Sequence, residues 1–130
     1  MSIVVIGLNH RTSPVELRER FAFAEGKIPD ALAALRASGV AHEATILSTC
    51  NRVEIYAVTP LAPDAAVAGL KKFLLTHHAF DGALGDELYF HAEPHSLHHL
   101  FKVAAGLDSM LIGETEIFGV HAPTVNLRLR

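Results

Sequence analysis

The chain has 130 residues, half of them hydrophobic, and a mean hydropathy of +0.29, which is enough for one ordinary domain with a real core. A net charge of −3 and a pI near 6.3 argue against a non-specific nucleic-acid binder, because phosphate contacts need a concentrated basic surface. The early apolar run at residues 3–8 is too short to span a bilayer and follows no basic segment, so we expect no membrane span, no secretory signal and a cytoplasmic location.

The first elements are a strand and a short helix. Residues 2–8 are rich in β-branched side chains, which predicts a strand. Ser13, Pro14 and Glu16 have the pattern of a helix start, with Ser13 as N-cap, Pro14 at the first helical position and Glu16 closing a capping box. We expect this helix to run to about Arg20.

A helix and two strands follow. Residues 29–38 have apolar positions on one helical face, and Gly39 is the preferred residue just past a helix end. Residues 44–48 and 53–58 predict two strands joined by a turn around Cys50.

The last predicted elements alternate helix, strand and helix. Pro63 suits the first turn of a helix that reaches His78. Residues 88–91 predict a short strand, and residues 94–105 predict a helix that ends at Gly106. In the helix from Pro63 to His78, the side chains expected to face inward are Val67, Leu70, Phe73, Leu74 and His77.

With the short capped helix set aside, the order of elements is βαββαβα. This order predicts the α+β class and a ferredoxin-like sandwich, with helices on one side of an antiparallel sheet. Residues 122–130 show no apolar period and are predicted to form a loose basic tail.

Cys50 is the only cysteine, and it lies in a polar segment between two apolar strands. One thiol cannot form an internal disulfide and is too few for a thiolate metal cage. Two interpretations remain open: a reactive thiol held on a tight turn, or a small buried hydrophobe. The polar neighbours disfavour burial, because they would have to be buried with it.

Three segments are distinctive in order and spacing: residues 7–19 (GLNHRTSPVELRE), 47–56 (LSTCNRVEIY) and 99–114 (HLFKVAAGLDSMLIGE). Together they resemble one family, the glutamyl-tRNA reductases, which open tetrapyrrole (porphyrin and heme) biosynthesis. The resemblance covers residues 3 to about 119. It implies the family's N-terminal catalytic domain at residues 1–119 and a divergent tail at residues 120–130.

The resemblance implies a reaction in two steps. The thiolate of Cys50 attacks the ester between glutamate and its tRNA and forms a thioester, and NADPH then reduces the thioester to glutamate-1-semialdehyde. A thioester accepts hydride more readily than an oxygen ester, so one hard step becomes two easier ones. No Gly-x-Gly-x-x-Gly fingerprint occurs in the chain, so we do not expect it to bind NADPH or complete the reaction by itself.

The catalytic residues implied are Cys50 and His99, where His99 would transfer a proton or position the ester. Backbone amides of the turn and the Arg52 guanidinium are candidate donors to the developing oxyanion. Arg52 also suits a carboxylate, the alternative being a surface arginine of the hairpin. The helical spacing of His95, His98 and His99 matches a metal site, but one helix offers too few ligands, and we expect no metal.

The resemblance also implies contacts with the glutamyl group. The residues concerned are Thr49, Asn51, Arg52, Ser109, Glu114, Thr115, Glu116 and Val120. For Ser109 the alternative is a helix N-cap, and for Glu114 it is a carboxylate that interacts with a helix dipole. The family usually continues with Pro-Gln-Ile-Leu-Gly-Gln after Glu114, so this chain departs from it at Thr115, Glu116, Phe118 and Val120.

The partners implied are glutamyl-tRNA, the aminotransferase that takes the semialdehyde, and a second copy in a homodimer whose dimerisation domain this chain lacks. Local contacts with RNA would use basic side chains: His10, Arg11, Arg18, Arg20 and Arg52. Two functions are compared: the thioester-forming domain of a reductase, whether a fragment, a frameshifted product or a natural short protein, and a non-catalytic module that binds glutamyl-tRNA or a partner. A generic ferredoxin-like binding domain is a third.

Overall fold

The structure, a computed structural model, describes residues 1–106 and 126–127. In this part of the chain, five strands form one sheet in the order β4-β1-β3-β2-β5, with every neighbouring pair antiparallel. The strands are β1 (Ser2–Asn9), β2 (Glu43–Ser48), β3 (Arg52–Thr59), β4 (Tyr89–His91) and β5 (Asn126–Leu127). The helices are α1 (Val15–Phe21), the 3-10 helix η1 (Glu25–Lys27), α2 (Ile28–Ala37), α3 (Pro63–His77) and α4 (His95–Ala104). The predicted α+β class with an antiparallel sheet is confirmed.

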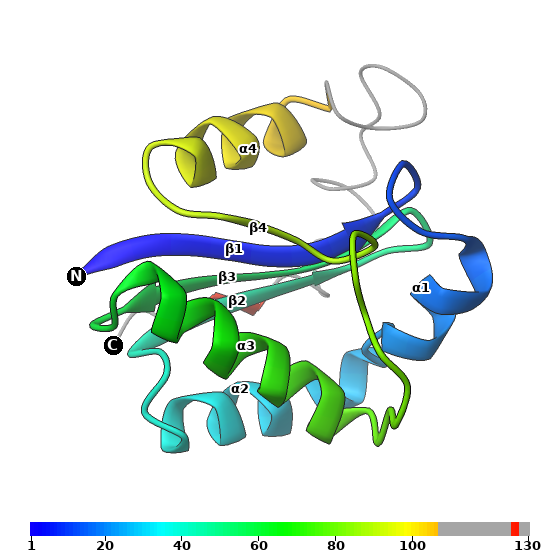
Figure 1. Ribbon diagram of the computed structural model, residues 1–130, viewed down its shortest axis with the longest axis horizontal. Helices are drawn as coiled ribbons and strands as arrows, with labels where there is room; N and C mark the ends of the chain where they lie inside the picture. Colours follow the sequence, from blue (N-terminus) through cyan, green and yellow to red (C-terminus); the bar gives the residue numbers. More distant parts are fainter. Residues whose placement is uncertain (107–125, 128–130) are drawn as a thin grey trace.

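The helices cover both faces of the sheet, whereas the sequence predicted helices on one side. Figure 1 shows α2 and α3 below the sheet and α4 above it. The strand β5 pairs with Thr45 and Ile46 of β2, and the sequence pattern did not predict it.

The face toward α2 and α3 is the hydrophobic core. Successive side chains of a strand point to opposite faces, so β1 and β3 each supply every second residue to this core. Buried apolar side chains of this core include Val4, Ile6, Leu8, Val53, Ile55 and Ala57 from these strands, with Leu32, Leu35, Leu70 and Leu74 from the helices. This packing leaves the alternate positions of both strands facing α4.

The face toward α4 is polar along part of β3. Arg52, Glu54 and Tyr56 alternate with the core residues of that strand. In the sheet register, Gly7 of β1 lies opposite Glu54 on one side and opposite Tyr89 of β4 on the other. The helix α4 is tied to this face by Ser96, whose Oγ donates to the carbonyl oxygen of Ile3 at 2.7 Å.

Most helix ends agree with the sequence pattern, but the capping box of α1 is wrong. The helix begins at Val15 without a side-chain cap, and Ser13 Oγ donates instead to the carbonyl oxygen of Asn9 at 3.0 Å. Gly39 and Gly106 follow α2 and α4 with φ values of 81° and 75°, as expected of residues past a helix end.

In α3 the predicted inward face is correct for Leu70 and Leu74, which are buried, and for Val67 and Phe73, which pack against the core. His77 is exposed, although its ring stacks on those of Phe23 and Phe73.

Candidate active site

The turn between β2 and β3 holds Cys50 at its tip. The backbone N–H of Thr49 donates to the carbonyl oxygen of Arg52 at 2.8 Å and closes the turn. The side-chain oxygen of Thr49 accepts from the N–H groups of Asn51 and Arg52, both at 3.2 Å. Cys50 is exposed on this turn, so the interpretation as a buried hydrophobe is wrong.

Arg18 of α1 joins this turn to the loop that follows β1. Its Nε donates to the carbonyl oxygen of Cys50 at 3.2 Å, and its Nη1 donates to that of Ser13 at 2.6 Å. The β1 loop is itself held by Asn9, whose Oδ1 accepts from the N–H groups of Arg11 and Thr12 at 2.9 and 3.2 Å. The backbone on both sides of the thiol is therefore fixed by side chains.

Glu54 is the centre of a buried polar cluster beneath α4. Its Oε2 accepts from Arg52 Nη1 at 3.3 Å and also from Tyr89 Oη and His99 Nε2. Its Oε1 accepts from Tyr56 Oη at 2.7 Å. We call Arg52, Glu54, Tyr56, Tyr89 and His99 the Glu54 cluster; it joins α4, β3 and β4 across the strand β1.

The donors around Glu54 determine its charge. Burial raises the pKa of this carboxyl, but the hydrogen bond from His99 and the charge of Arg52 outweigh burial, so its pKa lies below the ordinary value. Burial and the neighbouring carboxylate raise the pKa of Tyr89, which therefore stays a neutral phenol that donates. Glu54 is thus an ionised carboxylate inside the fold at neutral pH.

Gly7 gives the cluster its space. A Cβ atom at this position would lie 2.5 Å from the carbonyl oxygen of Val53, 2.8 Å from Glu54 Cγ and 3.1 Å from Tyr89 Oη. Because glycine has no Cβ, Tyr89 can reach across β1 to Glu54.

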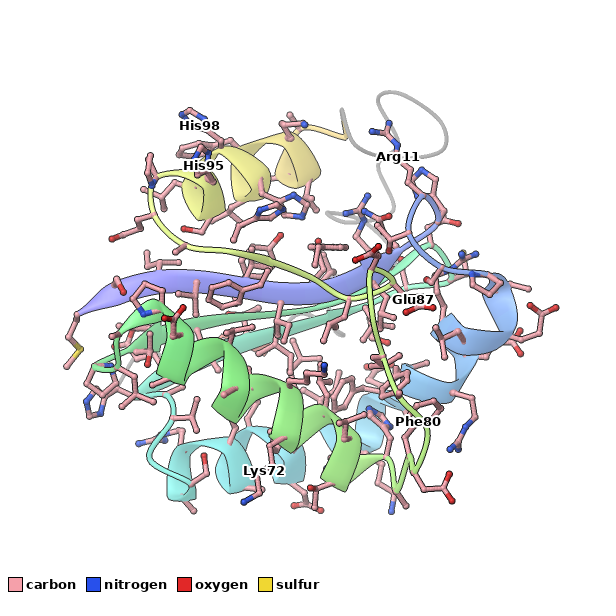
Figure 2. The ribbon with its side chains drawn as sticks, in the orientation of Figure 1. Arg11, Lys72, Phe80, Glu87, His95 and His98 are labelled. Carbon is pink, nitrogen blue, oxygen red and sulfur yellow. The ribbon has the colours of Figure 1, made fainter. Side chains whose placement is uncertain are left out.

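The three histidines of α4 do not share one direction. His99 contacts Glu54 beneath the helix, whereas His95 and His98 are exposed, and Figure 2 shows His98 on the side of α4 away from the sheet. Within residues 1–106 and 126–127, no group of three histidine, cysteine or acidic side chains is placed to hold a metal ion.

The residues predicted for the site are only partly brought together. Thr49, Cys50, Asn51 and Arg52 form one turn, while His99 meets that hairpin through Glu54. The residues Ser109, Glu114, Thr115, Glu116 and Val120 lie outside the part of the chain that the structure describes.

Two details of the hairpin differ from expectation. Arg52 is 1% exposed, so the alternative of a surface arginine is wrong. Backbone amides of the turn were predicted as oxyanion donors, and two of them, those of Asn51 and Arg52, already donate to the Thr49 side chain.

Glu54 and Tyr89 belong to this site but were not predicted from the sequence. A signal was present for Glu54, because an acidic residue between Val53 and Ile55 in a strand this apolar needs buried partners. Arg52, two positions earlier on the same strand face, is such a partner. Tyr89 gave no local signal, since its distance from Glu54 depends on the register of three strands.

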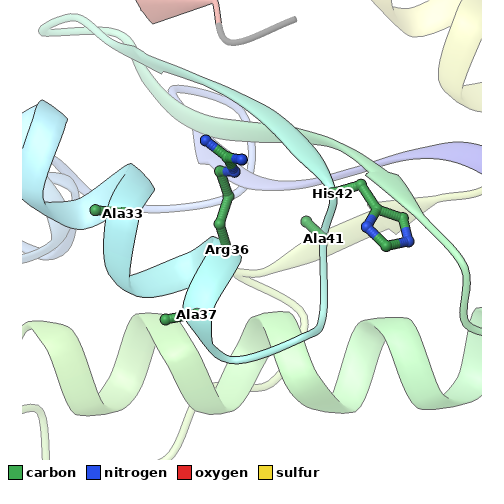
Figure 3. Close-up of a pocket in the computed structure, with 5 residues that line it drawn as sticks. All are labelled: Ala33, Arg36, Ala37, Ala41 and His42. Carbon is green, nitrogen blue, oxygen red and sulfur yellow. The ribbon is translucent and has the colours of Figure 1, made fainter. Parts of the chain in front are cut away.

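A surface hollow elsewhere involves none of these residues. It has a volume of about 390 Å³ and lies beside the end of α2 and the segment leading to β2 (Figure 3). Its lining residues are Ala33, Arg36, Ala37, Ala41 and His42.

The described residues do not fit an NADPH site. A dinucleotide ordinarily binds at the carboxyl ends of parallel strands, beside a glycine-rich turn that opens a helix. The described sheet is antiparallel throughout, and the 130 residues hold no such glycine pattern.

In the same described part of the chain, no helix combines the length and the apolar character that crossing a bilayer requires.

Comparisons with known proteins agree with this arrangement. The profile of the family described as "Glutamyl-tRNAGlu reductase, N-terminal domain" matches residues 6–120. A glutamyl-tRNA reductase of Stenotrophomonas maltophilia (strain K279a) is 51% identical over 119 residues, which is 92% of this chain and 26% of that protein. One of Magnetococcus marinus is 47% identical over 120 residues, which is 92% of this chain and 28% of that protein.

A solved structure is also similar. The glutamyl-tRNA reductase from Methanopyrus kandleri superposes with a TM-score of 0.68 at 30% identity, over 88% of this chain and 25% of that one. This chain therefore spans about a quarter of the length of the proteins it matches. Because the family profile covers nearly all of its residues, the chain belongs to the glutamyl-tRNA reductase family and corresponds to its N-terminal domain.

Proposed function

We propose that this chain is the domain of a glutamyl-tRNA reductase that captures the glutamyl group as a thioester on Cys50. The observation that carries the proposal is the exposed thiol at the tip of a turn whose backbone is held by Thr49 and Arg18. A nucleophile fixed in this way loses little freedom when it meets an ester, and such positioning contributes strongly to rate.

The acylation exchanges an ester for a thioester. The Cys50 sulfur gives up its proton and attacks the carbonyl carbon that joins glutamate to the terminal ribose of the tRNA. A carbon–sulfur bond forms, the carbon–oxygen bond to the ribose breaks, and the ribose oxygen leaves with a proton. His99 is the group we assign to that proton transfer, since imidazole exchanges protons near neutral pH.

The remaining assignments to the glutamyl group rest on the family resemblance. Arg52 would hold the glutamate carboxylate, and its position two residues from Cys50 on the same hairpin supports this role. The other contacts are assigned to Thr49, Asn51, Ser109, Glu114, Thr115, Glu116 and Val120.

The wider assignments concern the whole reductase. We propose that NADPH reduces the thioester to glutamate-1-semialdehyde, and that the described residues of this chain do not bind the NADPH. We propose that the whole reductase is a cytoplasmic homodimer. It would pass the semialdehyde to an aminotransferase. We also propose residues 1–119 as the domain and a ferredoxin-like topology for its sheet; the order β4-β1-β3-β2 supports the latter.

A labelling experiment tests the acylation. The 130-residue protein would be incubated with glutamyl-tRNA carrying labelled glutamate, quenched in acid and digested for mass spectrometry. We expect a glutamyl adduct on the Cys50 peptide that hydroxylamine removes, as it does a thioester. Cys50→Ser should lack the hydroxylamine-sensitive adduct while it keeps the circular dichroism spectrum of the wild type, because the side chain is exposed.

The second candidate, a non-catalytic module, predicts a different result. Such a module would bind glutamyl-tRNA in a filter-binding assay with equal affinity in the wild type and in Cys50→Ser, and neither protein would carry an adduct. Folded wild-type protein that stays unlabelled at saturating glutamyl-tRNA would exclude the thioester proposal.

A further inference from the structure

Glu54 has features that stability alone does not account for. The residue has no exposed surface and accepts hydrogen bonds from four side chains. Removing a carboxylate from water is expensive, and apolar residues of similar volume often serve a core equally well or better. A buried charge held by so many donors is therefore a candidate for a role in the site.

The contact between Glu54 and His99 fixes the state of the imidazole. An ionised carboxylate can only accept hydrogen bonds, so the ring nitrogen that meets it must carry a proton. That nitrogen is Nε2 of His99. When the ring is neutral, its lone pair is then on Nδ1, the nitrogen turned away from the carboxylate.

The rest of the Glu54 cluster holds the carboxylate in place. Arg52 and Tyr89 donate to Oε2, and Tyr56 donates to Oε1. All three come from strands of one sheet, whereas His99 comes from α4, so the carboxylate links a rigid base to a helix packed above it. The orientation of the imidazole follows that of Glu54.

We propose that Glu54 is the positioning residue for His99 in the acylation of Cys50, a role that rests on the function proposed above. Glu54 keeps the proton on Nε2 so that Nδ1 accepts the thiol proton, over a direct contact or one water. The imidazolium formed beside the carboxylate then gives that same proton to the departing ribose oxygen. One proton passes from sulfur to oxygen, and the charge of the dyad is restored.

The test compares the wild type with Glu54→Gln and with a matched control, Glu87→Gln. Glu87 lies in a surface loop, where its carboxylate accepts from the N–H of Gly85 at 2.8 Å (Figure 2). The two-bond nitrogen–proton correlations of the imidazole report which ring nitrogen carries the proton. The rate of adduct formation on Cys50 would be measured on the same three proteins.

We expect Nε2-protonated His99 in the wild type and in Glu87→Gln. In Glu54→Gln the side-chain amide can donate to Nε2, so the proton should move to Nδ1, and acylation should slow by roughly 10²-fold. A purely structural role would leave the tautomer of the folded variant unchanged.

Two results would overturn the proposal: a proton on Nδ1 in the wild type, or a folded Glu54→Gln variant that retains the wild-type tautomer and rate. The wild-type spectrum gives the tautomer of His99 without any variant, so it tests the proposal even if Glu54→Gln fails to fold. If the wild type forms no adduct at all, the acylation itself fails, and the tautomer still shows whether Glu54 sets the state of His99.

Discussion

At the scale of single residues, Thr49 does more than its place beside the nucleophile indicated. Its side chain replaces part of the backbone hydrogen bonding that a tight turn lacks, by accepting from two N–H groups. The side chain is nearly buried, so water is a poor substitute for that acceptor. The hydroxyl of Thr49 therefore supports the Cys50 backbone together with Arg18.

Replacing Thr49 with alanine should therefore lower the free energy of unfolding by about 1 kcal/mol, because two backbone N–H groups lose their acceptor. Thr49→Ser keeps the hydroxyl and should recover most of the loss. Urea unfolding followed by circular dichroism measures both. Equal destabilisation by alanine and serine would show that the methyl group, and not the hydroxyl, supports the turn.

The residues of the site were predictable where the signal is local. Thr49, Cys50 and Arg52 lie within four consecutive positions, and the polar character of this segment between two apolar strands identified the turn. The link from Glu54 to His99 spans 45 positions and depends on which face of the sheet α4 covers. No periodic pattern in the sequence predicts such a contact.

At the scale of elements, Gly7 shows how a strand accommodates the polar cluster. We expect Gly7→Ala to lower the free energy of unfolding by about 2 kcal/mol, because a methyl group would overlap the carbonyl oxygen of Val53 and displace Glu54. Gly26→Ala is the matched control, since nothing lies within 4 Å of its added Cβ.

Urea unfolding gives the stabilities of both glycine variants, and amide hydrogen exchange in α4 shows whether the helix loosens over the cluster. A Gly7→Ala protein as stable as Gly26→Ala would mean that β1 shifts freely, contrary to its pairing with β3 and β4.

Element boundaries were predictable where the chain itself supplies the stop. Gly39 and Gly106 end their helices because they adopt positive φ at little expense. The capping box of α1 failed because the N-cap position is Pro14, which places Ser13 one residue before the cap. The Ser13 hydroxyl donates instead to the carbonyl oxygen of Asn9 at the end of β1, a contact that depends on how the chain turns after the strand.

At the scale of the whole molecule, the fold keeps one histidine, His78, unprotonated at weakly acidic pH because it is packed among aromatic rings. His78 packs against Phe21 and Phe23, and its buried Nε2 has no hydrogen-bond partner among the described residues. Burial, with the nearby His77 and Arg20, lowers the pKa of His78 from 6.5 to about 4.

The unfolded chain therefore takes up a proton below pH 6.5 that the folded protein refuses until about pH 4. We expect the free energy of unfolding to fall by about 1–2 kcal/mol between these pH values, after allowance for the partial exposure of the ring. Below about pH 4.5 the protonation of Glu54, whose pKa folding lowers, should add to the loss.

Urea unfolding from pH 7 to 4 measures this dependence. His78→Phe should flatten the curve, leaving a smaller slope from His77 and His91, whose pKa values burial also lowers. The exposed His98, changed to glutamine, should leave the slope as in the wild type. An unchanged slope in His78→Phe would assign the acid sensitivity to other groups.

The alternation of apolar and polar residues in β3 limits how the Cys50 turn can change length. Hairpin tips commonly tolerate the gain or loss of a residue. Here, sliding β3 by one position against β1 would turn Val53 and Ile55 toward α4 and drive Arg52 and Glu54 into the apolar core. A buried charge stripped of its partners costs about 3–5 kcal/mol, a large part of the stability of a small domain. Insertions and deletions in the turn at residues 49–52 are therefore more damaging than substitutions. The spacing between the Cys50 thiol and the Glu54 carboxylate is preserved by the folding of the sheet itself.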